Sequence, residues 1–231
     1  MVRVLVTRPE PGAARTAQRL AELGFMPLML PLSRTVSLPT RLPEGVDFAG
    51  VAATSANGLR HADASILAGL RHLPLYAVGT KTASLATSQG FSRIKTARGD
   101  ALSLARLIVE DRQTAALAYL CGRVRLSGFE AVLREAGVEV AAIETYDTMT
   151  VQRETRELAG LLGSQPIDAA LIYSAKAAGA LREIVDKMGG IFENTHYICI
   201  SARVAEGLAG LSKVDIARRP DEDAMFTLLA R

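Results

Sequence analysis

Residues 117–143 read LAYLCGRVRLSGFEAVLREAGVEVAAI, and the pattern of this stretch decides the fold. An apolar run at Leu117–Leu120 precedes a helical stretch with apolar residues every three or four positions, and a second apolar run follows at Glu139–Ile143. Apolar runs that alternate with amphipathic helices are typical of parallel strands covered by helices. The stretch therefore predicts a strand, a helix and a strand.

The predicted helix has its own start and stop signals. Ser127 and Glu130 have the spacing of a capping box, and Gly137 is a typical C-terminal stop. One face of the helix is apolar and is formed by Phe129, Val132, Leu133 and Ala136. We expect this face to pack against the sheet.

The same alternation of apolar runs and helices continues along the whole chain. It predicts an α/β protein with ten strands, which suit two sheets of five. The predicted strands are Arg3–Val6, Met26–Leu30, Gly50–Thr54, Leu75–Val78, Arg93–Thr96, Leu117–Leu120, Glu139–Ile143, Asp168–Ile172, Tyr197–Ile200 and Val214–Ala217.

An internal repeat organises these strands. Residues 15–33 resemble residues 128–146, residues 50–60 resemble 168–181, and residues 75–86 resemble 197–208. The order along the chain is therefore A, B, A′, B′, and each lobe needs one A unit and one B unit to complete its sheet. The repeat alone leaves open whether A pairs with the adjacent B or with the distant B′.

Composition and charge exclude several classes of protein. The chain has 231 residues, 49% of them hydrophobic, with 27 Lys plus Arg against 24 Asp plus Glu, which is an ordinary globular composition. The basic residues are scattered, so we expect no nucleic-acid partner. No apolar stretch approaches the ~20 residues of a membrane span, and Arg3 and Arg8 interrupt any signal-peptide core. We expect a cytoplasmic protein without a membrane partner.

Metal and cofactor motifs are also missing from the sequence. Cys121 and Cys199 lie in apolar runs, where buried free thiols are expected. The three histidines, His61, His72 and His196, share no ligand spacing, so no metal site is predicted. Neither a G-x-G-x-x-G nor a G-x-x-x-x-G-K-[ST] loop is present, so we expect no dinucleotide or P-loop nucleotide.

Polar residues follow the apolar runs at the C-terminal ends of the predicted strands. Ligands of open parallel sheets bind beyond these ends, where helix N-termini present free N–H groups. Two facing rims of this kind would form a cleft suited to a substrate with several carboxylates. The rim residues are Thr7 and Arg8, Ser55 and Asn57, Gly79 to Thr82, Gly122 and Arg123, Ser174 and Lys176, and Ser201 and Arg203.

Collinear segments through nearly the whole chain point to one family. They are VLVTRPEPGAARTAQRLAELGFMPLMLP, TSANGLR, YAVGTKTASLATSQGF, YLCGRVRLSGFEAVLREAGVEVAAIETYDT and SARVAEGLAG. The Thr-Arg-Pro opening, the Val-Gly-x-x-Thr-Ala segment and the Glu-x-Tyr-x-Thr segment carry most of the weight. In these segments the chain resembles the uroporphyrinogen-III synthase family.

This resemblance implies an architecture. It implies two flavodoxin-like lobes, each a five-stranded parallel sheet flanked by helices, joined by a two-segment linker, with A paired to B′ and B to A′. The first lobe would comprise residues 1–34 and 150–231, the second residues 38–146, and the crossings residues 35–37 and 147–149.

The resemblance also implies a reaction. Members of the family cyclise the linear tetrapyrrole hydroxymethylbilane to uroporphyrinogen III in heme biosynthesis, with inversion of ring D, loss of water and no cofactor. We expect a monomer that receives its substrate from the preceding deaminase. The alternative is a non-catalytic two-lobed protein of the same fold that binds a small molecule.

Tyr146 is the candidate proton donor, because the matching tyrosine of the family faces the cleft. A phenol keeps its proton at neutral pH, its reference pKa being about 10. The alternative is a linker tyrosine that only packs its ring. The predicted substrate-binding residues are Arg8, Ser55, Asn57, Gly79, Thr80, Thr82, Gly122, Arg123, Ser174, Lys176 and Ser201.

Each binding residue also has a purely structural interpretation. Gly79 to Thr82 also fits a plain strand-to-helix turn with a threonine cap, and Ser55 and Ser174 fit N-caps. The cations Arg8, Arg123 and Lys176 could be ordinary solvated surface charges. Ser201 is followed by Ala-Arg-Val rather than the Gly and Thr pattern that the family usually shows at this place.

Overall fold

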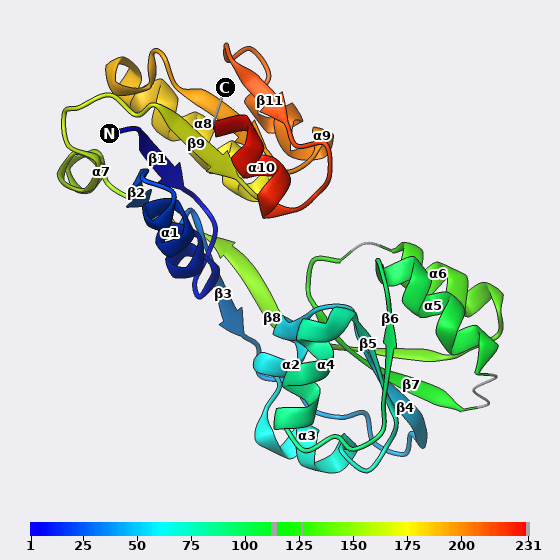
Figure 1. The fold of residues 1–231 in the computed structure, drawn as a ribbon. Coiled ribbons are helices and arrows are strands. Elements are labelled where there is room, and N and C mark those ends of the chain that lie inside the picture. Colours follow the sequence, from blue (N-terminus) through cyan, green and yellow to red (C-terminus); the bar gives the residue numbers. More distant parts are fainter. Residues whose placement is uncertain (112–114, 126, 230–231) are drawn as a thin grey trace. The chain divides into compact units, whose positions relative to one another are not determined.

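The computed structural model describes residues 1–111, 115–125 and 127–229 and divides into two compact units (Figure 1). Unit 1 comprises Met1–Arg34 and Met149–Arg231, and unit 2 comprises Thr35–Thr148. Unit 1 is therefore discontinuous in the sequence, whereas unit 2 is one continuous stretch of chain.

Unit 1 is built on a five-stranded parallel sheet with the order β11-β10-β9-β1-β2. Its strands are β1 (Arg3–Val6), β2 (Met26–Met29), β9 (Ala169–Ile172), β10 (His196–Cys199) and β11 (Val214–Ile216). Its helices are α1 (Gly12–Glu22), α7 (Thr155–Leu162), α8 (Ala175–Met188), α9 (Ala202–Ala205) and α10 (Glu222–Leu229), with the 3-10 helices η1 (Gly189–Phe192) and η2 (Glu206–Leu208).

Alternate residues of β1 face opposite sides of the sheet, and both sides are buried. Leu5 packs in a core cluster with α7, α8 and α9, whereas Val4 and Val6 pack in a second cluster with α1 and α10. This is the two-residue period of a strand covered on both faces, and it explains why β1 reads as an uninterrupted apolar run.

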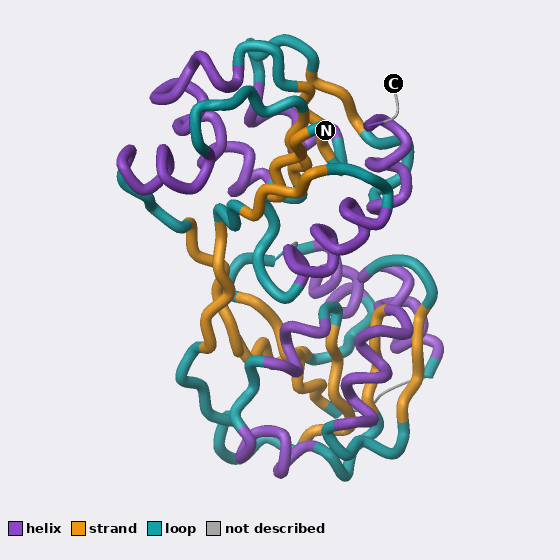
Figure 2. The backbone as a smooth tube through the Cα atoms, turned by 60° about the vertical axis from the view of Figure 1, so that its left-hand side comes forward, coloured by secondary structure: helices purple, strands orange, loops and turns teal. Residues whose placement is uncertain are grey.

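Unit 2 is built on a six-stranded sheet with the order β3-β8-β7-β4-β5-β6. Its strands are β3 (Ser33–Ser37), β4 (Phe48–Ala53), β5 (Leu75–Val78), β6 (Ile94–Ala97), β7 (Ala116–Gly122) and β8 (Val140–Thr150). Helices α2 (Ala56–Arg60), α3 (Ala64–Leu70) and α4 (Gly79–Ser88) cover one face, and α5 (Ala101–Glu110) and α6 (Gly128–Glu135) cover the other. Figure 2 shows helices on both sides of the strands in each unit.

The strand orders answer the pairing question that the repeat leaves open. The first A unit supplies β1 and β2, which share a sheet with β9, β10 and β11 of the distant B′ unit. The B unit supplies β4, β5 and β6, which share the other sheet with β7 and β8. Each sheet therefore combines one copy of each unit.

One prediction needs correction: unit 2 has six strands rather than five. The ten predicted strands are present, β1 and β5 with the predicted bounds and the others with shifted ends, and β3 is an additional one. Backbone hydrogen bonds from Leu38 N to Thr145 O (2.9 Å) and from Val151 N to Leu32 O (3.0 Å) pair β3 with β8 in the antiparallel sense. The predicted strand at Glu139–Ile143 consequently continues to Thr150 as β8. Its extension is stabilised by this pairing rather than by an apolar run.

The predicted capping box is a second correction. In the described part of α6, the Ser127 side chain makes no capping hydrogen bond. Arg125 instead binds the Glu130 carboxylate, with 3.2 Å from Nε to Oε2, so Glu130 is engaged outside the box. The predicted apolar face is present, because Phe129 and Leu133 are buried against the sheet.

Other sequence features have simple structural outcomes. Cys121 and Cys199 are buried free thiols, as predicted. Across the described residues, no helix has the length and apolar character that crossing a membrane requires.

Candidate functional site

The most connected group of candidate residues in unit 2 surrounds helix α2. Ser55 is the N-cap of α2, His61 is its C-cap, and Tyr146 of β8 contacts both. The Ser55 side chain lies close enough to the Tyr146 phenol to lower its pKa, and the Tyr146 and His61 ring centroids lie 5.8 Å apart with planes tilted by 37°. Tyr146 therefore has a neighbour at each end of α2.

A close backbone approach fixes α2 on the sheet. A Cβ atom on Gly58 would lie 2.3 Å from the carbonyl oxygen of Leu120, so only glycine permits this contact between α2 and β7. The buried Thr145 adds a hydrogen bond from its Oγ1 to the Gly58 carbonyl oxygen at 2.8 Å. The helix that holds Ser55 and His61 is thus set by a glycine and a buried hydroxyl.

A register shift in the sheet aims Tyr146 at α2. Cys121 of β7 aligns with Glu144 of β8, but the next residue, Gly122, aligns with Tyr146, so Thr145 is an extra residue in β8. Such bulges bend a strand and redirect side chains. The Arg123 amide donates to the Tyr146 carbonyl oxygen at 2.9 Å and closes the irregular pairing.

Gly122 leaves the room that the phenol ring occupies. A Cβ atom on Gly122 would lie 2.7 Å from Tyr146 Cζ and 3.0 Å from its hydroxyl oxygen. These distances are shorter than van der Waals contact, so a side chain at position 122 would displace the ring. Gly122 is predicted as a substrate-binding residue, and in the structure it provides the space for the Tyr146 ring.

The electrostatic surroundings keep Tyr146 protonated. Burial raises the pKa of Tyr146, and the hydrogen bond to Ser55 offsets only part of this effect. Burial, together with the neighbouring Arg60 charge, lowers the pKa of His61, so His61 is neutral at pH 7. Two uncharged rings therefore face each other, and the phenol is available as a proton donor.

The N-terminus of α4 is the second candidate part of the unit 2 rim. Gly79 has φ +71°, and no atom lies within 4 Å of where its Cβ would be. No side chain among the described residues caps the helix, so the predicted threonine cap is not formed. Thr80 is exposed, whereas Thr82 is buried. The first amide groups of α4 thus remain available to an anion.

Asn57 and Arg123 complete the predicted set in unit 2. The Asn57 amide donates to Ser55 Oγ at 3.2 Å, and its side-chain oxygen accepts from Arg60. The Arg123 guanidinium is exposed and lies 3.4 Å from a Glu144 oxygen and 3.5 Å from an Asp147 oxygen. Arg123 is therefore partly neutralised.

Arg8 in unit 1 belongs to an internal ion-pair cluster. Its Nη1 lies 3.0 Å from Glu222 Oε1, and its guanidinium covers the Tyr173 ring at 4.5 Å from the centroid. Glu222 also accepts from the Tyr173 hydroxyl at 2.9 Å and from Arg19 at 2.6 Å. Arg8 thus already has a carboxylate partner.

The other predicted residues of unit 1 lie at helix starts. Ser174 caps α8, because its Oγ accepts from the Ala177 amide at 3.1 Å. Lys176 is exposed in the first turn of the same helix. Ser201 is at the N-cap position of α9, where the described residues show no side-chain cap.

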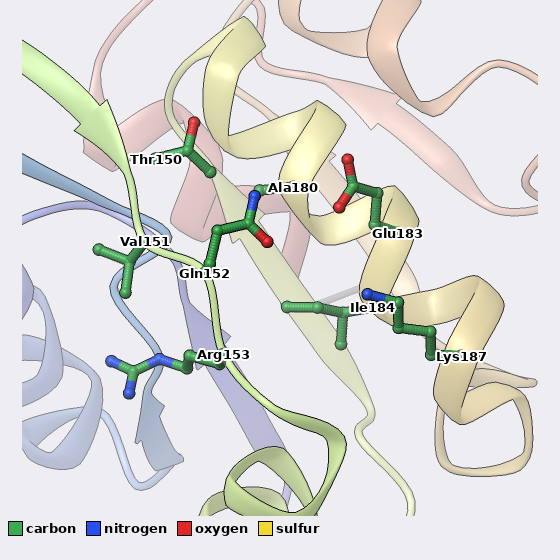
Figure 3. Close-up of a pocket in the computed structure, with 8 residues that line it drawn as sticks. All are labelled: Thr150, Val151, Gln152, Arg153, Ala180, Glu183, Ile184 and Lys187. Carbon is green, nitrogen blue, oxygen red and sulfur yellow. The ribbon is translucent and has the colours of Figure 1, made fainter.

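A small pocket in unit 1 is too small to hold a substrate. It lies between α8 and residues 150–153, with Glu183 and Lys187 on the helix side and Arg153 on the chain segment (Figure 3). Its cavity volume is about 10 Å³, roughly the space of one water molecule. Among the described residues, no group of three or more His, Cys, Asp or Glu side chains is placed to hold a metal ion.

Sequence reasoning missed two members of these clusters. The spacing of the histidines excludes His61 as a metal ligand and assigns it no other role, although its place three residues after Gly58 is a signal that it borders the same helix as Ser55. Glu222 lies 214 residues from Arg8, and nothing in the local sequence indicates that pairing.

Comparisons with known proteins point in one direction. The family model described as uroporphyrinogen-III synthase HemD matches residues 14–227. The crystal structure of uroporphyrinogen-III synthetase from Helicobacter pylori is 18% identical and superposes with a TM-score of 0.73 over 100% of this chain and 99% of that chain. A mutant uroporphyrinogen III synthase from the extremely thermophilic bacterium Thermus thermophilus is 22% identical, with a TM-score of 0.57 over 100% of this chain and 98% of that chain. These two likenesses concern the fold. No curated protein sequence matches the chain significantly.

Proposed function

The chain belongs to the uroporphyrinogen-III synthase family, and we propose that Tyr146 of unit 2 is the proton donor of its reaction. The reaction is the cyclisation of hydroxymethylbilane to uroporphyrinogen III, with inversion of ring D and loss of water, which makes the protein a cyclising lyase of tetrapyrrole biosynthesis. The observation that supports the donor role is the half-buried phenol held between Ser55 and His61.

The proposed chemistry begins with departure of the hydroxyl group. The Tyr146 hydroxyl donates its proton to the hydroxymethyl oxygen, the carbon–oxygen bond breaks, and water leaves. Because burial raises the pKa of Tyr146, the phenol is protonated at neutral pH before this step. The remaining methylene carbon is an electrophile conjugated with its pyrrole ring.

Ring inversion follows through a spiro intermediate. The substituted α-carbon of ring D attacks the methylene carbon, and the bond from that α-carbon to the preceding methylene bridge then breaks. The bridge carbon rejoins ring D at its free α-carbon, which loses a proton as the ring regains aromaticity. That proton balances the one taken from the phenol, so the net change is loss of one water.

The acetate and propionate groups of the substrate are the anions that bind at the C-terminal ends of the strands. Helix N-termini bind carboxylates through free amide groups and the helix dipole. In unit 2 the uncapped start of α4 supplies such amides, with Gly79 and Thr80, while Asn57 remains a predicted contact whose own amide donates to Ser55. Thr82 is buried, so its hydroxyl is withdrawn from such a contact. Arg8, Ser174, Lys176 and Ser201 of unit 1, and Arg123, remain predicted substrate contacts.

Orientation supplies most of the selectivity in this proposal. The linear substrate also closes unaided without inversion, so the protein must hold ring D in the geometry that favours attack by the substituted carbon. Well-oriented groups gain large effective concentrations without strong acid–base catalysis. We place the reaction in the cytoplasm, in a monomer that receives hydroxymethylbilane from the preceding deaminase. A mass near 24.6 kDa in light scattering would support the monomer.

Isomer analysis tests the proposal. Hydroxymethylbilane is made in place from porphobilinogen by a deaminase, and the oxidised products are separated into type I and type III uroporphyrins. The protein should yield type III, and Tyr146→Phe should lower turnover about tenfold or more, with type I increasing as unaided closure competes.

A matched tyrosine controls for the loss of a hydroxyl. Tyr76→Phe in β5 also removes a buried hydroxyl, one that donates to Asp111, and should retain the parent turnover. Parent turnover in Tyr146→Phe would remove Tyr146 from the mechanism.

A further inference from the structure

His61 is a neighbour of the Tyr146 ring that the proposed chemistry leaves without a role. Its imidazole lies 5.8 Å from the phenol ring, centroid to centroid, at a tilt of 37°. At this distance two aromatic rings restrict each other's orientation, and tilted pairs of this kind are favourable. A side chain at position 61 therefore decides which orientations the phenol can adopt.

The imidazole is itself fixed from two sides. The His61 amide donates to the Asn57 carbonyl oxygen at 3.1 Å, which makes His61 the last residue tied to α2. Its Nδ1 lies 3.0 Å from Ser37 Oγ on β3. The imidazole ring is thus held between the end of α2 and the edge strand β3. It therefore limits the movement of the neighbouring Tyr146 ring.

Charge does not disturb this contact at neutral pH. Arg60 is the charged neighbour that acts on His61, while β3 contributes the uncharged Ser37 and β8 the protonated Tyr146. Burial and the charge of Arg60 both disfavour the imidazolium form, so His61 packs against Tyr146 as a neutral imidazole.

We propose that His61 is a positioning residue for Tyr146: the imidazole, held by Ser37, keeps the phenol hydroxyl beside Ser55 at the start of α2. The idea rests on the proposed role of Tyr146 as proton donor. His61 itself touches no reacting atom in this scheme. Without the imidazole, the phenol ring can rotate away from Ser55 while the fold around α2 stays intact.

Kinetics of paired variants separate this role from a structural one. His61→Ala should lower kcat about tenfold through misplacement of the donor, while KM changes less than about twofold, because the substrate carboxylates bind elsewhere on the rim. His61→Phe keeps a ring on the phenol and should recover most of kcat. Ser37→Ala removes an exposed hydrogen bond without touching the core, and should lower kcat in the same direction by a smaller factor.

The Tyr146→Phe background tests whether His61 acts through the phenol. There, His61→Ala should cause no further loss, because the hydroxyl to be positioned is gone. An equal loss in both backgrounds, or parent kcat in His61→Ala, would overturn the inference.

A titration keeps the inference testable apart from activity. The ultraviolet difference between the parent and Tyr146→Phe isolates the ionisation of Tyr146 among the five tyrosines. His61→Ala should shift that ionisation to lower pH, because the phenol becomes better solvated. If Tyr146→Phe keeps full turnover but the shift is seen, the donor proposal fails and the positioning of the ring by His61 stands. An unchanged titration overturns the positioning.

Discussion

Gly122→Ala places a single methyl group against the proposed proton donor. The added Cβ would lie 2.7 Å from Tyr146 Cζ, 2.8 Å from Cε2 and 3.0 Å from the hydroxyl oxygen. All three atoms belong to the tip of a side chain rather than to backbone. Gly122 also lacks the positive φ that would strain an alanine. The ring, not the sheet, should therefore move.

The size of the effect follows from these distances. To restore ordinary contact near 3.4 Å, the ring must retreat by about 0.7 Å. A displacement of about 1 Å at a reacting group costs up to about 100-fold in rate, so we expect kcat to fall by about 10- to 100-fold. Overpacking a core costs about 1–3 kcal/mol, and a movable ring should keep the loss of unfolding free energy at the low end.

Two measurements check this expectation. Isomer-resolved product analysis gives kcat and the type III fraction, and urea unfolding gives the free energy of unfolding. Gly160→Ala in α7 is the matched control, because its Cβ would meet nothing within 4 Å and alanine favours helix. Parent kcat in Gly122→Ala would refute the link between phenol position and turnover. A loss of stability well above about 3 kcal/mol would show that the backbone takes the strain instead.

Three further predictions concern stability and reactivity. Gly58→Ala would place a Cβ 2.3 Å from the Leu120 carbonyl oxygen. Urea unfolding should therefore show a loss of about 3 kcal/mol or more in the free energy of unfolding. A smaller loss would mean that α2 can move away from β7. Burial raises the pKa of the Cys121 and Cys199 thiols to about 12, so neither should react with a thiol reagent at pH 8 until the protein is unfolded, and rapid labelling of the native protein would contradict their burial. Burial disfavours the ionised form of Glu222, but hydrogen bonds from its neighbours outweigh burial and lower the pKa of Glu222 below 4.5. The stabilisation of the folded state that results is complete above pH 4.5 and is lost as the pH falls through the lowered pKa. Glu222→Gln should flatten that acid dependence in urea unfolding, and an unchanged pH profile would exclude Glu222 as its source.

The fold was largely predictable because burial on both faces leaves a plain signal. Strands such as β1 and β5 match their predicted bounds, since every residue in them must be apolar or packed. The strand β3, with the sequence Ser-Arg-Thr-Val-Ser, has no such run, because it lies at a sheet edge and is stabilised by pairing with β8. Edge pairing depends on a distant segment, which local sequence does not report.

The candidate site was predictable in part for the same reason. Ser55, Gly122 and Tyr146 follow strand ends in the predicted sheet, so sheet topology alone brings them to one rim. The register shift at Thr145, which turns the phenol toward α2, has no sequence signature. The sequence places His61 near the same helix, but its contact with the Tyr146 ring depends on that turn and has no local signal.

The discontinuity of unit 1 imposes an order on folding during synthesis. Strand β1 lies inside its sheet, between β2 and β9. The amide of its first residue, Arg3, donates to the carboxylate of Asp168, 165 residues further along the chain. As the ribosome adds about 5–20 residues per second, the nascent β1 waits about 8–33 seconds for this partner. Unit 2 is contiguous and emerges complete within that interval. The apolar N-terminal strands are thus the segment of the newborn chain most in need of shielding, and chaperone dependence should be concentrated there.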